Sequence, residues 1–289
     1  MEFVFQQFIT GLSIGSILLL VALGLSVIYG SMGVINMAHG EFIMLGAYAS
    51  WACGAFLGLG LFPSLIVAFI GVAVIGGLVE LSVIRFLYRR TLDTILATWG
   101  IGVILQQIVR LSAGGELRYV EMPSFLASSV PVFGVAVSGY RLFIIVAVAA
   151  LFGVTWYLLN RTTNGMKLRA VIQDPAIATS FGIDAGRMRT LTFAYGAGLA
   201  GLAGALVAPL KSVSPEMGTT YVVDAFFVVV LGGVQSLFGT VASSFILGQF
   251  TGVLAFWQND TIAKALVLVI VVVLIRFRPQ GLFVTKVRA

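Results

Sequence analysis

Between residues 36 and 41 an amide, an imidazole and a carboxylate interrupt a stretch that is otherwise apolar (Asn-Met-Ala-His-Gly-Glu). Ionisable groups at membrane depth are costly, so they indicate a function by default. Two interpretations stay open. The side chains of Asn36, His39 and Glu41 contact a transported solute, or they are structural: Asn36 caps a helix that begins near Gly40, and Glu41 complements its dipole. One histidine and one glutamate make too short a chain for a proton relay.

Further polar side chains interrupt two other apolar runs. Gln106 and Gln107 are adjacent on one predicted helix, so they cannot both face lipid, and at least one must face a neighbouring helix or a cavity. The alternative is that these side chains only hydrogen-bond to a neighbouring helix and hold the two helices together. The residues predicted to line a solute pathway are Asn36, His39, Glu41, Thr98, Trp99, Gln106, Gln107, Gln235 and Ser236.

Residues 174–182 carry the clearest local pattern. Asp174 is a helix N-cap, Pro175 suits the first helical position, and Gly182 stops the helix after two turns. Ile177 and Phe181 are four residues apart and share one face. A two-turn helix with an apolar face, outside the membrane and among arginines, needs a partner to cover it. The alternative is that it lies flat on lipid.

Signatures of catalysis are missing from the sequence. The glycine pattern from Gly233 to Gly239-Thr240 lacks the lysine of a phosphate-binding loop, and none of the four lysines follows a glycine as that loop requires. A single histidine without a nucleophile elbow gives no hydrolase signature. The one cysteine, Cys53, can form no intrachain disulfide. We therefore predict no catalytic residue and no metal site.

The composition is that of a membrane protein. Hydrophobic residues make up 60% of the chain and charged residues 10%, against about a quarter charged in soluble domains. The mean hydropathy is +1.08, and the 34 glycines let membrane helices approach closely. We predict an all-α polytopic membrane protein with about seven to nine transmembrane or re-entrant helices.

Runs of about 20 apolar residues place the spans. Residues 225–257 are too long for one span and too interrupted for two, because Leu-Gly-Gly-Val-Gln-Ser-Leu-Phe-Gly occupies 231–239. We interpret this stretch as a half-helix that breaks at membrane depth and continues as a second helix. The other predicted spans are 5–30, 40–57, 63–88, 93–113, 140–159, 190–210 and 261–277.

Basic residues orient this arrangement. If the loops after residues 88 and 159 and the C-terminal tail are cytoplasmic, they hold 12 of the 17 lysines and arginines, which predicts a periplasmic N-terminus and a cytoplasmic C-terminus. Glu80 is expected to pair with the nearby arginines rather than line a pathway. The 12 are Arg85, Arg89, Arg90, Arg161, Lys167, Arg169, Arg187, Arg189, Arg276, Arg278, Lys286 and Arg288.

An internal repeat is also predicted. Residues 11–48 and 196–250 each contain a Gly-rich helix, a broken segment (33–41 and 231–239) and a small-residue helix. Inverted repeats with broken helices point to a transport site at the midplane; chance likeness in composition is the alternative. We expect one transmembrane domain over 1–289, with a first repeat at about 5–113, a periplasmic loop at 114–139, and a second half at 140–289 that includes a cytoplasmic loop at 161–189.

The whole chain resembles the permeases of ABC importers for branched-chain amino acids, amides and urea. The resemblance rests on Gly11-Leu-Ser-Ile-Gly-Ser, on residues 33–48, on 196–205 and on 230–239, in the same order. It is most similar to the urea and short-chain amide branch, through residues 83–88, 96–102 with the two glutamines, 141–145 and 221–225. Met37 and Gln235 depart from the residues usual in the family.

The resemblance implies an inner-membrane permease subunit that forms half of a translocation pathway. It implies a second homologous permease subunit, two cytoplasmic ATPase subunits that use ATP and Mg, and a periplasmic substrate-binding protein. This chain itself would hold no cofactor and bind no nucleic acid. The resemblance also implies that the helix at 174–182 couples to an ATPase through Asp174, Pro175, Ile177, Phe181 and Gly182.

The substrate is predicted from the polar inventory. An amino acid needs charged or helix-end partners for its two charges, whereas urea needs only neutral donors and acceptors. Because the polar residues within the spans are mostly neutral, we predict urea or a short-chain amide, with a branched-chain amino acid as the alternative. An ATP-independent secondary transporter or channel is the alternative of another class, but it would not need the helix at 174–182.

Overall fold

The computed structural model describes residues 2–283 except 89, 133–134, 258 and 279. It confirms the all-α class, and seven of the described helices are long and apolar enough to cross a membrane. The helices are α1 (Glu2–Met32), α2 (His39–Leu57), α3 (Leu61–Ser82), α4 (Thr91–Ala113), α5 (Ser124–Ala127), α6 (Gly139–Arg161), α7 (Thr163–Gln173), α8 (Pro175–Ser180), α9 (Ala185–Val207), α10 (Met217–Gly232), α11 (Leu237–Trp257) and α12 (Asp260–Phe277).

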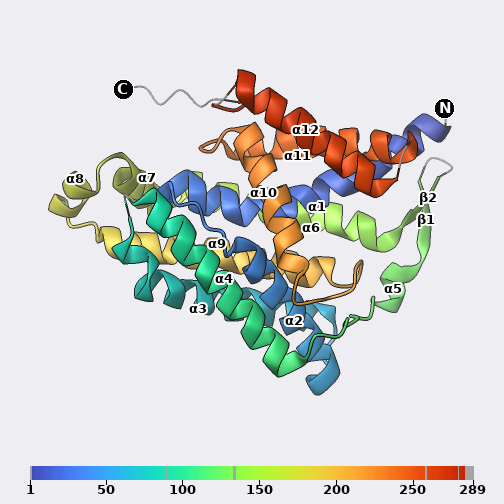
Figure 1. Ribbon diagram of the computed structural model, residues 1–289, viewed down its shortest axis with the longest axis horizontal. Helices are drawn as coiled ribbons and strands as arrows, with labels where there is room; N and C mark the ends of the chain where they lie inside the picture. Colours follow the sequence, from blue (N-terminus) through green and yellow to red (C-terminus); the bar gives the residue numbers. More distant parts are fainter. Residues whose placement is uncertain (1, 89, 133–134, 258, 279, 284–289) are drawn as a thin grey trace.

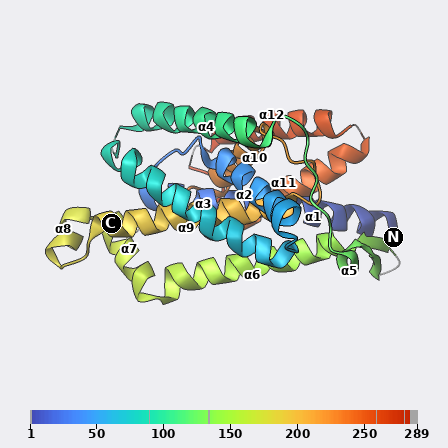
Figure 2. The same ribbon diagram turned by 90° about the horizontal axis from the view of Figure 1, so that it is seen from below.

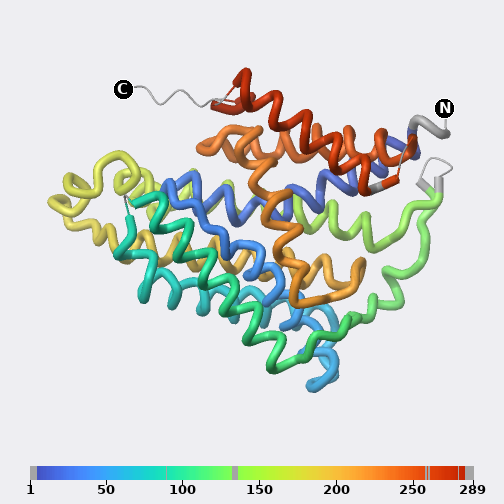
Figure 3. The backbone as a smooth tube through the Cα atoms, viewed as in Figure 1, coloured from blue at the N-terminus to red at the C-terminus, as the bar shows by residue number. Residues whose placement is uncertain are grey.

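The bundle has two distinct ends. Helices α7 and α8 project at one end, and the antiparallel hairpin of β1 (Ser129–Val132) and β2 (Val135–Ser138) lies at the other (Figure 1). We call these the α8 end and the hairpin end. Helix α1 begins at the hairpin end, and α12 runs back toward the α8 end (Figure 3). Of the basic residues counted above, Arg89, Lys286 and Arg288 lie outside the described residues.

Glycines allow the central helices to touch. Gly24 of α1 and Gly196 of α9 face each other so closely that a Cβ on either would collide with the backbone of the other helix. A Cβ on Gly46 of α2 would collide with the backbone of Gly201 of α9, and a Cβ on Gly201 would collide with Ala68 and Val72 of α3. Such small residues are typical of packed membrane helices, because they bring backbones within van der Waals contact. The large share of glycine in the sequence is therefore used at the centre of the bundle.

Helix packing relates the first four long helices to the last four. In this comparison α1, α2, α3 and α4 correspond to α9, α10, α11 and α12. The contact of α1 with α11 then corresponds to that of α9 with α3, and the contact of α2 with α9 to that of α10 with α1. The contact of α2 with α4 corresponds to that of α10 with α12. Gly58 after α2 and Gly233 after α10 both have positive φ, 61° and 97°. This pairing differs from the predicted match of 33–41 with 231–239, because the complete helix α10 lies between α9 and the second break.

The predicted break within 225–257 is present at residues 233–236, but its surroundings differ from the prediction. Helix α10 begins at Met217, well before 225, because Asp224 is paired with Lys264 (Oδ2 to Nζ, 3.3 Å) and so fits inside a helix. Helix α11 is long enough to cross a membrane by itself. The break lies beside the last turns of α1, where a Cβ on Gly30 would be 2.8 Å from the Val234 carbonyl oxygen.

Two loops contain structure that the sequence patterns did not predict. Residues 114–139 include α5 and the β1–β2 hairpin. Helix α7 lies between α6 and α8, and the Thr162 hydroxyl caps it by accepting a hydrogen bond from the Gly165 amide (3.2 Å). The predicted span 261–277 is α12, which carries three charged residues and is not among the seven candidate spans.

Candidate functional site

The polar segment at 36–41 forms the break between α1 and α2. Helix α1 ends at Met32, Gly33 follows with φ +64°, and α2 begins at His39. The Asn36 side chain does not cap α2, contrary to one prediction. The N-cap is Ala38, whose amide donates to Asn36 Oδ1 (3.1 Å), so Asn36 instead closes the turn that leads into the helix.

Thr98 fixes this break to α4. Its hydroxyl accepts a hydrogen bond from the Met37 amide (3.1 Å) and donates one to the Thr94 carbonyl (2.8 Å). A backbone amide in a helix break has no carbonyl of its own helix to bond, so another group, here a side chain, must accept its hydrogen bond. Thr94, Thr98 and Gly102 are buried and lie one turn apart, which marks the face that α4 turns toward α2.

Helices α2 and α10 begin next to each other. Gly40 and Gly218, the second residue of each helix, are in such close contact that a Cβ on either would collide with the backbone of the other. A helix N-terminus carries a partial positive charge and unpaired amides. Two such ends therefore meet inside the bundle, and Figure 1 shows α10 crossing the long helices near the start of α2.

Glu41 lies at this meeting point. Its side chain is only 6% exposed. A Cβ on Gly218 would be 2.9 Å from Glu41 Oε2, and a Cβ on Gly102 of α4 would be 3.3 Å from Glu41 Cγ. The carboxylate is thus enclosed by the beginnings of α2 and α10 and by α4. The contact depends on glycine at both neighbouring positions.

Three buried polar atoms of this segment have no hydrogen-bond partner in the described chain: Asn36 Nδ2, His39 Nδ1 and Glu41 Oε2. An unsatisfied buried polar group costs about 1–3 kcal/mol, so such groups are rare unless a ligand, an ion or water pairs with them. We call Asn36, His39, Glu41 and Thr98 the α2 site. It combines unused hydrogen-bonding groups, a carboxylate and two helix N-termini.

His39 has a structural contact as well as an unused atom. Its ring is fully buried, and Nε2 donates to the Val21 carbonyl of α1 (3.0 Å). The ring also contacts Gly24, where a Cβ would be 3.1 Å from its Cε1. The histidine therefore bonds α2 to α1, and only Nδ1 of its ring is left without a partner in the described chain.

The remaining predicted pathway residues are not brought to this place. Trp99 is 62% exposed and Gln107 is exposed on α4, while Gln106 is half-buried. Gln235 and Ser236 lie at the second break, where the Ser236 hydroxyl accepts from the Gly239 amide (2.9 Å). Within the described residues, no three histidine, cysteine or acidic side chains are close enough to hold a metal ion.

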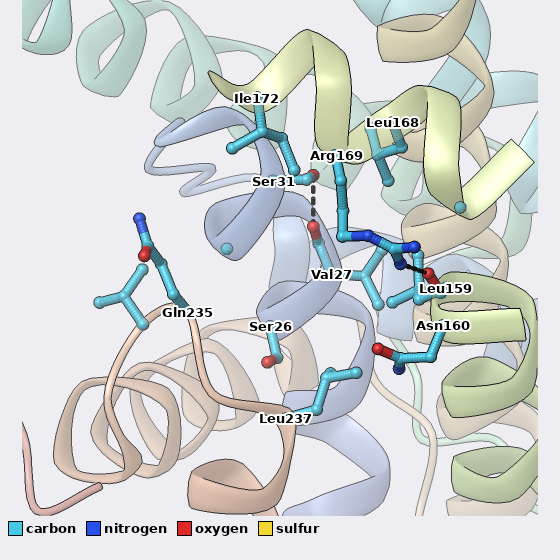
Figure 4. Close-up of a pocket in the computed structure, with 13 residues that line it drawn as sticks. Ser26, Val27, Ser31, Leu159, Asn160, Leu168, Arg169, Ile172, Gln235 and Leu237 are labelled. Atoms are coloured by element: carbon cyan, nitrogen blue, oxygen red, sulfur yellow. Dashed lines mark hydrogen bonds between the residues drawn. The ribbon is translucent and has the colours of Figure 1, made fainter. Parts of the chain in front are cut away.

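The second break borders a separate cavity of about 150 Å³. The last turns of α1, the end of α6 and helix α7 line it together with Gln235. Figure 4 shows Arg169 of α7 reaching toward the Leu159 carbonyl, to which it donates a hydrogen bond, while the Gln235 amide points away from it. Gln235 therefore stands next to the α7–α8 segment and not in the α2 site.

Helix α8 has the capping that the sequence predicts. Asp174 Oδ1 accepts from the amides of Ala176 (2.8 Å) and Ile177 (3.0 Å), and Gly182 has φ +80°. Ala178 is buried in a small cluster with residues of α7 and α9. Ile177 is 57% exposed and Phe181 82% exposed, so the predicted apolar pair faces away from the rest of the chain.

Glu80 is buried with partners other than those predicted. It is 1% exposed and accepts hydrogen bonds from the hydroxyls of Tyr88 (2.6 Å) and Thr190 (2.6 Å). Among the described residues no arginine pairs with Glu80, because α9 packs on α3 and brings Thr190 to it; Arg89 lies outside them. Arg90 pairs with Asp93 instead (3.7 Å). Burial and the bond to Glu80 raise the pKa of Tyr88.

Comparison with known proteins extends over nearly the whole chain. A family model described as the permease component of branched-chain amino acid transport systems matches residues 7–276. The high-affinity branched-chain amino acid permease LivH of Salmonella typhimurium is 31% identical, over 93% of each chain. The corresponding permease BraD of Pseudomonas aeruginosa is 28% identical, over 96% of this chain and 94% of its own. No solved structure matches.

Proposed function

The chain belongs to the family of permease components of branched-chain amino acid transport systems, and from that membership we propose that the α2 site forms half of a translocation pathway for an aliphatic amino acid. The chain is a multi-pass membrane subunit of an ABC importer and is not an enzyme. Its relatives are permeases, which work in complexes with ATPase subunits and a binding protein.

The observation that carries the proposal is Glu41 Oε2, which has no hydrogen-bond partner in the described chain and lies beside two helix N-termini. An α-amino acid has an ammonium group that a carboxylate attracts and a carboxylate group that helix N-termini attract. Both complements are present within one small region. Urea carries no charge, so it would leave Glu41 buried without a counter-charge, which is costly.

The argument for urea depended on a neutral polar lining, and the structure does not assemble that lining. Gln107 and Gln235 are exposed, and the Thr98 hydroxyl is already occupied by the Met37 amide. The relatives are also named as branched-chain amino acid permeases. Both facts favour the amino-acid alternative over urea or a short-chain amide.

The proposed complex contains a second homologous permease, two ATPase subunits and a periplasmic binding protein in the bacterial inner membrane. We place the α8 end in the cytoplasm and the hairpin end in the periplasm, which puts Arg161, Lys167 and Arg187 on the cytoplasmic side in accord with the charge bias. The exposed Ile177 and Phe181 of α8 would then face an ATPase. This exposed pair favours an ABC importer over an ion-driven carrier, which has no such subunit to bind.

The test is uptake by the assembled complex in vesicles. The wild-type complex is expected to accumulate labelled leucine and to ignore labelled urea. Glu41→Gln removes the negative charge and keeps the shape, so leucine uptake should fall at least tenfold while the complex still assembles, since removing one partner of a buried charge pair costs about 2–5 kcal/mol. Glu116→Gln, an exposed carboxylate at the hairpin end, is the matched control and should transport normally. Urea uptake without leucine uptake would overturn the proposal.

A further inference from the structure

A second and larger cavity lies at the hairpin end. It measures about 670 Å³ and lies between the last turns of α2, the first turn of α3 and residues 119–125. Figure 2 shows α3 on the near surface of the molecule, between α4 and α6, with the chain from α4 to α5 passing the ends of α2 and α3. The cavity is far larger than a water site needs, and its volume lies in the range of ligand pockets.

The cavity is continuous with an apolar surface on α3. Phe62 lines the cavity, and it begins a row of exposed side chains that recur every fourth residue, at 62, 66, 70, 74 and 78. At 1.5 Å per residue this row is about 24 Å long, which is most of the roughly 30 Å hydrocarbon core of a bilayer. Beyond Phe62, the side chains of this row are each more than half exposed in the described chain. Phe125 stacks on Phe62 (ring centres 6.3 Å apart) and places aromatic rings at the mouth, as is usual at the membrane surface.

Polar groups are present at the cavity as well. Ser50 is 1% exposed, lines the cavity, and its hydroxyl has no hydrogen-bond partner in the described chain. Arg118 stands just outside the lining, with its guanidinium 4.8 Å from the ring centre of Trp51, which forms one wall. The guanidinium donates to the Ala113 carbonyl (2.8 Å) and lies 3.9 Å from the Glu116 carboxylate, while its Nε has no hydrogen-bond partner in the described chain. Glu121, three residues after Arg118 on the same segment, is exposed and lines the cavity. The cavity thus has aromatic walls, a buried hydroxyl, and both a positive and a negative side chain beside it.

We propose that this cavity binds the headgroup and glycerol region of an aminophospholipid, with an acyl chain lying along the exposed row on α3. The phosphate complements Arg118, the ammonium group complements Glu121 and the aromatic rings, and the Ser50 hydroxyl donates to an ester or phosphate oxygen. As part of a membrane-spanning helix, the row on α3 lies in the hydrocarbon region, so the acyl chain of a lipid in the cavity can lie along it. The site is independent of the α2 site and of the solute that is transported.

Filling the cavity tests the proposal. Gly54 lines it, and a Cβ there meets only the Leu59 carbonyl oxygen at 3.9 Å, so Gly54→Leu occupies the cavity without a backbone clash. Gly153→Leu is the matched control, because Gly153 is exposed on α6 and a Cβ there meets nothing. Phe125→Ala provides a second variant, since it removes one wall outside the membrane helices. The probe is dioleoylphosphatidylethanolamine added to the detergent-purified complex, with bound lipids counted by native mass spectrometry.

Wild type and Gly153→Leu should bind one lipid tightly, and Gly54→Leu and Phe125→Ala should bind it at least tenfold more weakly. Dioleoylglycerol, which lacks the phosphate and the amine, should also bind at least tenfold more weakly to wild type. Equal binding by all four proteins overturns the proposal. Gly54→Leu could instead keep its lipid but lose the partner permease, or lose the stimulation of ATP hydrolysis by loaded binding protein. That result would also overturn the proposal, because the cavity would then be a protein interface.

Discussion

Three acidic side chains stand inside the helix bundle, and each has a different surrounding. Glu80 accepts hydrogen bonds from two hydroxyls, Asp224 pairs with Lys264, and Glu41 Oε2 has no partner in the part of the chain that the structure describes. A satisfied buried carboxylate stabilises the fold around it, whereas an unsatisfied one lowers stability and is available to a ligand. The same residue type therefore has a structural role at one position and a functional role at another.

This difference predicts opposite effects on stability. Glu80→Ala removes the acceptor that the hydroxyls of Tyr88 and Thr190 share, which leaves them only the Met32 sulfur (3.8 Å) and the Gly186 carbonyl (3.1 Å), and it should destabilise the protein by about 2 kcal/mol. Glu41→Ala removes a buried charge without a partner and should leave stability unchanged or increase it. Thermal unfolding of the purified permease in detergent measures both. If Glu41→Ala melts as early as Glu80→Ala, Glu41 has a protein partner and the α2 site loses its unpaired charge.

The sequence could predict the first polar segment but not its surroundings. Asn36, His39 and Glu41 stand out because they interrupt an apolar run, and all three are buried in one place. The partners of Glu80 could not be predicted, because Thr190 is 110 residues away and only the packing of α9 on α3 brings it close. The exposure of Trp99 and Gln107 could not be predicted either, since a polar or aromatic residue in an apolar helix does not indicate which face of the helix packs against the rest of the chain.

At the scale of elements, α4 covers the α2 site and contacts the break through Thr98. Thr98→Val removes the acceptor of the Met37 amide, which leaves a part-buried donor unpaired at a cost of about 1–3 kcal/mol. We expect leucine uptake to fall several-fold while ATP hydrolysis without substrate is retained. Thr98→Ser keeps the hydroxyl and should transport nearly as well as wild type. Equal uptake by Thr98→Val and Thr98→Ser would mean that the bond from α4 does not shape the site.

Helix α8 belongs to the same scale, because a six-residue helix depends on its surroundings. Isolated helices below about 12 residues are marginal in water, and Asp174 capping alone does not explain why Phe181 is exposed. Phe181→Ala should remove an anchor worth roughly 2 kcal/mol or more in an ATPase groove, so that ATPase subunits co-purify about 30-fold more weakly. Phe86→Ala, also at an exposed phenylalanine, is the control. Normal assembly and transport by Phe181→Ala would leave α8 resting on lipid.

The elements differ in how well the sequence predicts them. Helix α8 was predicted in detail because Asp174, Pro175 and Gly182 are local signals. Helix α7 was missed because its apolar residues are few and its stability comes from packing against α8 and α9. The start of α10 was placed too late, because Asp224 looks like a break until its pairing with Lys264 is known.

At the scale of the whole molecule, two sets of four helices pack in corresponding ways, and their second helices, α2 and α10, meet at Gly40 and Gly218. We propose that they form an inverted repeat that places the α2 site near the middle of the membrane. The repeat matches α1 with α9 and α2 with α10. Composition alone could not find that match, because Gly-rich helices occur at several places in the chain, and only contacts show which of them correspond.

An inverted repeat requires the two ends of the bundle to face opposite sides of the membrane, and this gives the final prediction. Single cysteines replace Glu116 and Arg187, whose side chains are both highly exposed. Residue 116 lies on the segment that leads from α4 to α5 and the hairpin, and residue 187 lies in the first turn of α9, just after α8. The native Cys53 is buried and should be replaced by serine to remove background. An impermeant thiol reagent added to intact cells should label Glu116→Cys, and it should label Arg187→Cys only after the membrane is opened, because the α8 end carries the basic residues that stay in the cytoplasm. Labelling of both from the same side would refute the arrangement of spans, whereas labelling in the reverse order would keep the spans, invert the orientation and remove α8 from the reach of any cytoplasmic ATPase.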